Sequence, residues 1–355
     1  MSSDNKALSF IKSQRLYILM LLFVAAASIF AAGYPDKEED GASSGKKIHR
    51  LMSRQEIILQ ERRIKEILEE DRFLGNAVAA FAFLCAAILI AGLVLCVRGL
   101  ALKLSGRNVM AAYGAPPDVG WGALDVLKAV VVFLFFGYVL AFSELIIAHV
   151  FALKGHDERL ATVLHATMMD AIGISIVLYF VIKKFKGKIA DLGVSFKDFL
   201  RDIRIGVIGY IAILPILALI LVIVISVLQL IKYDQPASTA LEILYEDSRP
   251  KLLLILTVLV TFLGPVAEEL FFRGFAYPAI RKRLGVRNAV IIVSAVFAML
   301  HMNVVAFFPI LGLGVLLAYL YEKTGSLIPS ISVHVIHNSA VVFLAYIYKI
   351  IALAK

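Results

Sequence analysis

The amino-acid sequence predicts an all-α fold, that of a polytopic helical membrane protein. Of its 355 residues, 61% are hydrophobic and 18% are charged, whereas soluble domains are about 45–50% apolar and about 25% charged. The mean hydropathy is +0.87. Several apolar runs reach the roughly 20 residues that a helix needs to cross a bilayer. These runs exclude a soluble, disordered or disulfide-rich secreted protein, and they lack the alternation of a transmembrane β-barrel.

About nine apolar segments are predicted to be transmembrane helices. They cover residues 16–33, 73–97, 129–153, 161–182, 206–231, 252–276, 289–301, 304–321 and 330–351. The first is either an anchor or a cleaved signal peptide, because small residues end it. The two cysteines share the second segment, where a helix holds them about 16 Å apart, so we expect no disulfide between them.

The distribution of basic residues predicts the orientation of the chain in the membrane. Lys6, Lys12 and Arg15 precede the first segment, and the positive-inside rule therefore places the N-terminus in the cytoplasm. Topology also accounts for the net charge of +9, so we expect no nucleic-acid partner. The basic loops and the lack of an organelle signal are compatible with a bacterial inner membrane. Residues 48–72 mix both charges with spaced Ile and Leu, which predicts an amphipathic helix outside the membrane.

The sixth segment, 252–276, contains charged residues that are costly at membrane depth. Each costs roughly 2.5–3.5 kcal/mol on the insertion scale, and this segment holds Glu268, Glu269 and Arg273. Glu269 and Arg273 have the i,i+4 spacing of an ion pair, so we interpret them as a structural pair. Adjacent helical residues point about 100° apart, which leaves Glu268 to face another group. Pro265 should kink the helix beside these acids.

Two later segments contain the polar groups that Glu268 can face. His301 ends the short seventh segment, and His334 and Asn338 lie one turn apart on the ninth, on the same helix face. At 1.5 Å of rise per residue, these groups and Glu268 fall within one half of the membrane. An acid, two imidazoles and an amide can bind and activate water.

These residues resemble the CPBP family of intramembrane proteases, which includes the CAAX prenyl proteases and relatives linked to bacteriocin immunity. Three ordered motifs carry the resemblance: Glu268-Glu269-xxx-Arg273, Phe297-xxx-His301 and His334-xxx-Asn338. We divide the chain into three regions, of which the resemblance covers the last. Residues 1–72 are an anchor or signal segment with a charged outer stretch, residues 73–189 are variable transmembrane helices, and residues 190–355 are the catalytic membrane core.

The resemblance implies intramembrane hydrolysis of a peptide bond in a membrane-associated protein or peptide. We assign Glu268 as the general base, acting directly or with His301, and His334 and Asn338 as donors to the oxyanion. No metal or other cofactor is preferred, because Asn338 is a good oxyanion donor and a poor zinc ligand. The alternative is zinc or another divalent metal held by Glu268, His301 and His334, a familiar ligand set.

Two other function classes stay open at this point. One is a non-catalytic membrane protein, such as an immunity factor or a scaffold. The other is a proton-coupled transporter, because acids and histidines inside the membrane also build proton relays.

Overall fold

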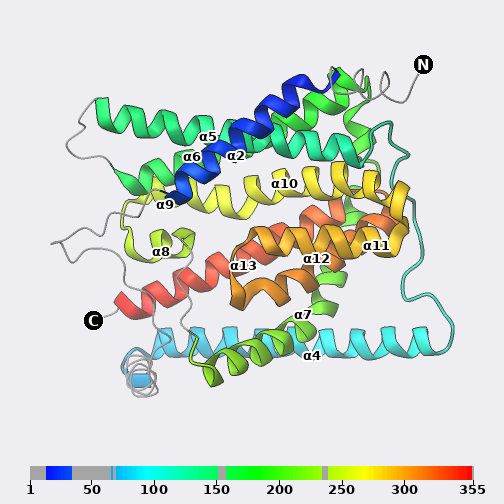
Figure 1. Ribbon diagram of the computed structural model, residues 1–355. Helices are drawn as coiled ribbons and strands as arrows, with labels where there is room; N and C mark the ends of the chain where they lie inside the picture. The colour runs from blue at the N-terminus through cyan, green and yellow to red at the C-terminus, as the bar shows by residue number, and fades with distance from the viewer. Residues whose placement is uncertain (1–12, 34–64, 67–68, 151–156, 234–238, 354–355) are drawn as a thin grey trace. The chain divides into compact units, whose positions relative to one another are not determined.

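A computed structural model describes residues 13–33, 65–66, 69–150, 157–233 and 239–353. Within these ranges the chain forms long helices joined by turns and contains no β-strand (Figure 1). This architecture confirms the predicted all-α, polytopic membrane fold. Most of the amphipathic helix predicted over 48–72 lies outside the described residues.

Seven helical stretches of the described chain are long and apolar enough to cross a membrane. They are Arg72–Leu104, Ala123–Ile147, Arg159–Lys184, Phe199–Leu230, Pro250–Leu300, Val304–Thr324 and Ile328–Ile351. The predicted count of nine is not confirmed, for two reasons. The apolar helix Arg15–Ala31 is shorter than the others, and Pro250–Leu300 is a single stretch of 51 residues.

Gly285 divides that long stretch into two legs. Its backbone has φ 77° and ψ 169°, a conformation that is essentially confined to glycine. The first leg contains the predicted sixth segment, and the second contains the seventh. A basic turn thus joins the leg with the two glutamates directly to the leg that ends in His301.

The described chain forms two compact units. The first contains α2 (Arg15–Gly33), α5 (Ala123–Val150), α6 (Glu158–Leu178) and the π-helical turn η1 (Tyr179–Lys184). Phe23 of α2 packs edge to face on Phe135 and Phe142 of α5. The Asp157 carboxylate caps α6 by accepting the backbone N–H of Leu160 at 3.1 Å, as expected at a helix N-terminus.

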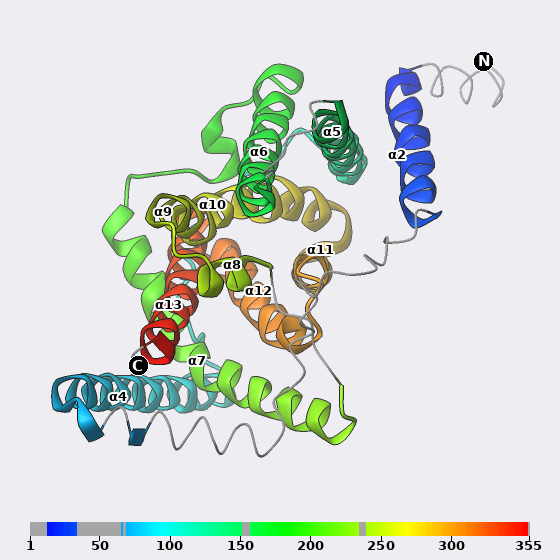
Figure 2. The ribbon, with the colours of Figure 1, turned by 90° about the vertical axis from the view of Figure 1, so that its left-hand side faces the viewer.

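The second unit contains the remaining helices. They are α4 (Arg72–Leu104), η2 (Ile189–Leu192, which begins at the boundary), α7 (Phe199–Leu230), α8 (Thr239–Glu246), α9 (Pro250–Val258), η3 (Leu259–Leu263), α10 (Gly264–Glu269), η4 (Leu270–Ala276), α11 (Tyr277–Leu300), α12 (Val304–Thr324) and α13 (Ile328–Leu353). In this unit α12 packs against α7, α11 and α13, and α10 packs against α13 (Figure 2). The helix that carries the acids therefore lies beside the helix that carries His334.

The core of the second unit is centred on α12. Its leucines pack with side chains of α7 and α13, in a cluster formed by Tyr210, Leu217, Leu313, Leu317, Leu320 and Val333. Asn303 caps the start of α12 through the N–H of Ala306 at 2.9 Å. Gly325 ends the helix in the left-handed conformation, which is a common helix terminator.

Close packing of α4 on α7 depends on small and polar side chains. A Cβ atom at Gly92 would lie 2.3 Å from the backbone oxygen of Ile211, so only glycine permits this approach. That oxygen lies four residues before Pro215, which has no N–H to donate to it. Nearby, the Cys96 thiol donates to the oxygen of Ala212 at 2.7 Å. Both cysteines are free, in agreement with the expected lack of a disulfide.

Candidate active site

The two glutamates lie on a short α-helical segment between two π-helical turns. Leu259–Leu263 and Leu270–Ala276 are π-helical, and Gly264–Glu269 between them is α-helical. The N–H of Gly264 bonds to the oxygen of Leu259, five residues earlier, and Pro265 follows with no N–H. The structure thus has a π-helical turn just before Pro265, where a kink was expected, and such turns are frequent at functional sites.

Glu269 and Arg273 form a completely buried ion pair. Arg273 Nη1 lies 2.7 Å from Glu269 Oε1, and both side chains are 0% exposed. The guanidinium also donates to the oxygen of Gly314 at 3.3 Å, and it lies 4.4 Å from the centroid of the Phe297 ring. Arginine suits such a site because its fork makes several contacts and its plane stacks on aromatic rings.

His334 lies between the two glutamates. Its Nδ1 is 2.9 Å from Glu269 Oε1, and its Nε2 is 3.6 Å from Glu268 Oε2. The side chain is only 2% exposed. A carboxylate accepts hydrogen bonds, so Nδ1 of His334 carries a hydrogen and donates a hydrogen bond to Glu269. In the neutral imidazole, Nε2 then presents its lone pair toward Glu268.

Glu268 differs sharply from its neighbour. Its side chain is 37% exposed, yet its Oε2 atom is buried and has no hydrogen-bond partner among the residues that the structure describes. The 3.6 Å between Oε2 and Nε2 of His334 exceeds a direct hydrogen bond. The Glu268 carboxylate is therefore accessible from outside while one of its oxygens faces an imidazole.

His301 lies next to this cluster, on the far side of an aromatic ring. It ends α11 and is exposed. Its ring is 4.8 Å from the centroid of Phe297, whose ring in turn lies 5.5 Å from His334. Because Nδ1 of His301 donates to the carbonyl of Phe297 at 2.8 Å, Nε2 is the free nitrogen of the neutral ring. No hydrogen bond joins His301 to Glu268 or His334 within the described chain.

Asn338 contacts backbone rather than another residue of the predicted site. Its Nδ2 donates to the oxygen of Val260 at 2.8 Å, in the π-helical turn η3. His337, which directly precedes Asn338 in α13, bonds through Nδ1 to the hydroxyl of Tyr210 at 3.1 Å. The structure thus places His334 and Asn338 against the helical leg that runs from Val260 to the two glutamates (the glutamate helix), and it places His337 against α7.

The alternative metal site is not assembled by these side chains. Within the described ranges, no group of three or more His, Cys, Asp or Glu is placed so that it could hold a metal ion. Glu268 and His334 face each other, but Nδ1 of His334 is occupied by Glu269 and His301 stands apart. As placed, Glu268, His301 and His334 do not come together as the ligands of one metal ion.

Sequence reasoning missed three elements of the site. The carbonyls of Val260 and Gly314 have no signal in the amino-acid sequence, since any residue carries a backbone oxygen. Phe297 is part of one of the three motifs, but its contact with Arg273 and with both imidazoles was not predicted. The signal for Val260 is indirect, because Pro265 must leave one earlier carbonyl of the helix without a donor.

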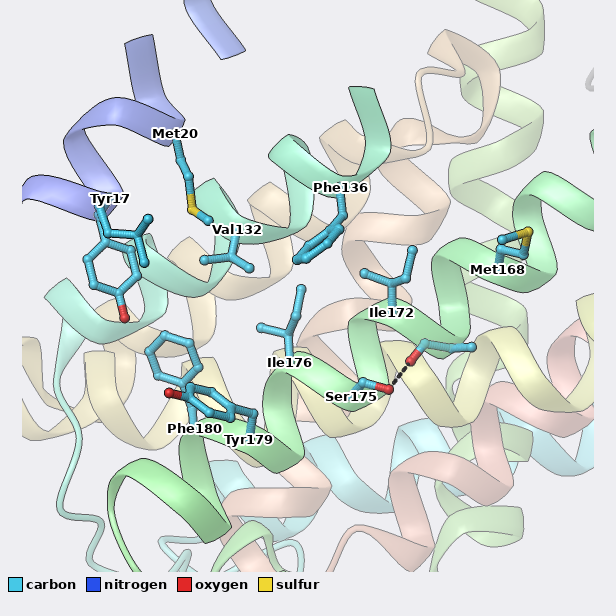
Figure 3. Close-up of a pocket in the computed structure, with 12 residues that line it drawn as sticks. Tyr17, Met20, Val132, Phe136, Met168, Ile172, Ser175, Ile176, Tyr179 and Phe180 are labelled. Atoms are coloured by element: carbon cyan, nitrogen blue, oxygen red, sulfur yellow. Dashed lines mark hydrogen bonds between the residues drawn. The ribbon is translucent and has the colours of Figure 1, made fainter. Parts of the chain in front are cut away.

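A separate groove occurs in the first compact unit. It has a volume of about 550 Å³ and is lined by twelve residues of α2, α5, α6 and η1 (Figure 3). The polar groups of the lining are the hydroxyls of Tyr17, Ser175 and Tyr179, and the hydroxyl of Ser175 bonds to Ala171 O at 2.7 Å. None of these residues is an acid or a histidine, so the groove suits an apolar group but lacks groups for hydrolysis.

Comparison with known protein families gives a match over part of the chain. Residues 250–340 match the family model described as Type II CAAX prenyl endopeptidase Rce1-like. No curated protein and no solved structure matches the chain. The matched residues contain all three motifs, and the match confirms the predicted resemblance of this chain to the CPBP and CAAX prenyl protease family.

Proposed function

We propose that this protein is an intramembrane endopeptidase of the CAAX type, which hydrolyses a peptide bond of a membrane-associated protein. The family match covers the segment that carries the acids and imidazoles. One observation supports the proposal most directly: a buried, unpartnered oxygen of Glu268 faces Nε2 of His334 at 3.6 Å. This gap is too short for a water molecule to fit between the two atoms, so we propose that the reacting water binds where the Glu268 side chain is exposed.

In the proposed reaction Glu268 is the general base. It takes a proton from water, and the water oxygen attacks the carbonyl carbon of the scissile peptide. The C–N bond then breaks, and Glu268 returns the proton to the leaving amine. General-base assistance typically contributes about 10²–10⁴-fold to the rate. The exposed part of the Glu268 side chain gives a substrate access to this carboxylate.

The buried partners of Glu268 have supporting roles in this proposal. Glu269 accepts Nδ1–H of His334 and so fixes the orientation of the imidazole, while Arg273 balances the charge of Glu269. His334, when protonated on Nε2, can donate to the oxyanion that forms on the peptide. His301, with Nε2 as its free nitrogen, is proposed to assist Glu268. Asn338, predicted as a second oxyanion donor, has its Nδ2 bonded to the oxygen of Val260 at 2.8 Å.

The substrate class follows from the membrane setting. Peptide bonds reach these helices only in a membrane-associated protein or peptide, and we propose a multi-pass location in a cell membrane with a cytoplasmic N-terminus. The name of the matched family suggests a prenylated C-terminal segment as the substrate to test first. An unprenylated peptide of the same sequence is the matched control.

The deciding experiment compares membrane proteomes of cells that express the wild-type protein and Glu268→Gln. The variant keeps the shape of the side chain and loses the base, so cleavage products of the substrate should disappear. Glu144→Gln, which alters a carboxylate of the other compact unit, should leave the products unchanged.

The same experiment tests the two other function classes. Products that persist in Glu268→Gln would contradict the proposed base. A biological effect that persists in this variant without any cleavage product would support a non-catalytic binding protein. Proton-coupled uptake of a solute into proteoliposomes, abolished by Glu268→Gln, would support a transporter.

A further inference from the structure

The carbonyl of Val260 has no donor within its own helix. The N–H of Gly264 bonds to the oxygen of Leu259, five residues earlier, so it is not available to Val260 four residues earlier. The next nitrogen in this i→i+5 pattern belongs to Pro265, which has no hydrogen. The π-helical turn and the proline together leave one carbonyl unsatisfied two turns before Glu268.

Asn338 supplies the missing donor from another helix. Its Nδ2 lies 2.8 Å from the Val260 oxygen, at the ordinary distance of a hydrogen bond. An unpaired carbonyl inside a membrane-spanning helix is costly, so we infer that this bond stabilises the π-helical turn at this place. Without the bond from Asn338, α-helical hydrogen bonding, in which the N–H of Gly264 donates to the oxygen of Val260, becomes more favourable.

Asn338 and His334 hold the glutamate helix at two levels. They lie four residues apart on α13, on one helix face. His334 contacts the glutamates themselves at 2.9 and 3.6 Å, and Asn338 contacts Val260, ahead of Pro265. A third contact further along the same two helices joins the hydroxyls of Thr257 and Tyr346 at 2.8 Å.

We propose that Asn338 is a positioning residue: by donating to Val260 it holds the π-helical turn η3, and this turn aims the Glu268 carboxylate at Nε2 of His334. The inference rests on the proposed function. The segment from Gly264 to Glu269 is a short stretch of α-helix, so its rotation about the axis is set by where the preceding π-helical turn ends. Asn338 thus acts on the reaction through the direction of Glu268.

This role differs from that of an oxyanion donor in one testable way. A positioning role exists only because residue 265 has no N–H, whereas an oxyanion donor contacts the substrate whatever residue stands there. Pro265→Ala restores an N–H that can serve the Val260 carbonyl. It should therefore make Asn338 dispensable if Asn338 positions the turn, and leave Asn338 essential if Asn338 contacts the oxyanion.

The experiment is a double-mutant cycle of Asn338→Ala and Pro265→Ala in the full-length protein, with cleavage of a membrane-associated substrate as the readout. We expect Asn338→Ala alone to lower kcat roughly tenfold at unchanged KM. In the Pro265→Ala background the same change should lower kcat less than about twofold, because the pair is energetically coupled. A cost of about 10²–10³-fold in both backgrounds would overturn the proposal in favour of an oxyanion donor.

The thermal midpoint of the four proteins in detergent provides a second measurement, which applies if Pro265→Ala lowers activity by itself. Asn338→Ala should lower the midpoint in the native background and leave it nearly unchanged in the Pro265→Ala background. Tyr346→Phe is the matched control, since it removes a hydrogen bond between the same two helices. Its effect on the midpoint should be equal in both backgrounds. Equal effects of Asn338→Ala in both backgrounds would contradict the proposal.

Failure of the proposed function gives a different pattern. If the protein is not a protease, no cleavage that depends on Glu268 will be seen with the native chain, and the positioning role falls with the reaction. If the midpoint changes of Asn338→Ala and Pro265→Ala are then still not additive, both residues act on the hydrogen bonding of the Val260 carbonyl. If Glu268-dependent cleavage occurs and the coupling is missing, only the inference about Asn338 is wrong.

Discussion

Each compact unit of the described chain contains a contact between a carboxylate and an imidazole. Nδ1 of His165 in α6 lies 3.0 Å from Oε1 of Glu144 in α5, and Nδ1 of His334 lies 2.9 Å from Oε1 of Glu269. The first pair is open, with side chains 33% and 38% exposed. In the second pair the side chains are 2% and 0% exposed.

The difference between the pairs lies in what surrounds each carboxylate. Both oxygens of Glu144 face the same nitrogen of His165, at 3.0 and 3.1 Å. Glu269 instead shares one oxygen between Arg273 and His334, and Glu268 faces the opposite side of that imidazole. The buried imidazole is therefore held by one acid while its other nitrogen faces a second acid, an arrangement that the pair of Glu144 and His165 does not have.

The largest expected effect concerns the stability of the buried pair. Arg273→Met leaves the Glu269 carboxylate buried without its cation, and removing one partner of a buried ion pair typically costs about 3–5 kcal/mol. The variant should accumulate poorly and melt at a lower temperature in detergent. His165→Gln breaks the open pair and should cost less than about 1 kcal/mol. Equal losses of stability in the two variants would show that burial does not make the second pair more important for stability than the first.

The next effect concerns the rate of cleavage. His334→Gln removes the group that faces Glu268, and we expect a fall in kcat of about 10²–10³-fold, the usual cost of losing a donor to the oxyanion. His165→Gln should change kcat less than about twofold. The measurement is the initial rate of cleavage with purified protein in liposomes. Comparable losses would mean that the Glu144 pair also takes part in the reaction.

Metal removal is expected to have the smallest effect. Glu268, His301 and His334 do not form a metal-binding group within the described residues, and the proposed reaction uses the carboxylate as its base. Dialysis of the purified protein against a chelator should therefore leave the cleavage rate unchanged. A loss of activity that added zinc restores would contradict this prediction and favour the alternative ligand set.

The amino-acid sequence predicted the helices better than it predicted their breaks. Apolar runs identify α4, α7, α12 and α13, because a membrane-spanning helix needs about 20 apolar residues. Gly285 was not recognised as the turn between two legs, since a single glycine among basic residues has no distinctive pattern. The predicted count of segments and the count of long helices differ because the apolar helix Arg15–Ala31 is short and because the two legs beside Gly285 form one continuous helical stretch.

The candidate site was predictable only in part. Spacing of i,i+4 predicts a pair between Glu269 and Arg273, and the structure contains it at 2.7 Å. His334 was expected to face Glu268, but its contact with Glu269 was not predicted, because it depends on how α13 lies against α10. α-Helical geometry would assign the carbonyl left free by Pro265 to Thr261, four residues earlier. The π-helical turn moves it to Val260, and sequence patterns do not reveal this shift.

The π-helical turn before the glutamates has a consequence for insertions and deletions. An i→i+5 ring encloses one residue more than the i→i+4 ring of an α-helix. Deleting a single residue from 259–263 would let this turn become α-helical and change the direction of every later side chain by up to about 100°. Glu268 would then leave His334 even though every motif letter is intact. The length of the segment 259–263 is therefore as important for the direction of Glu268 as the identity of the acids is for the chemistry.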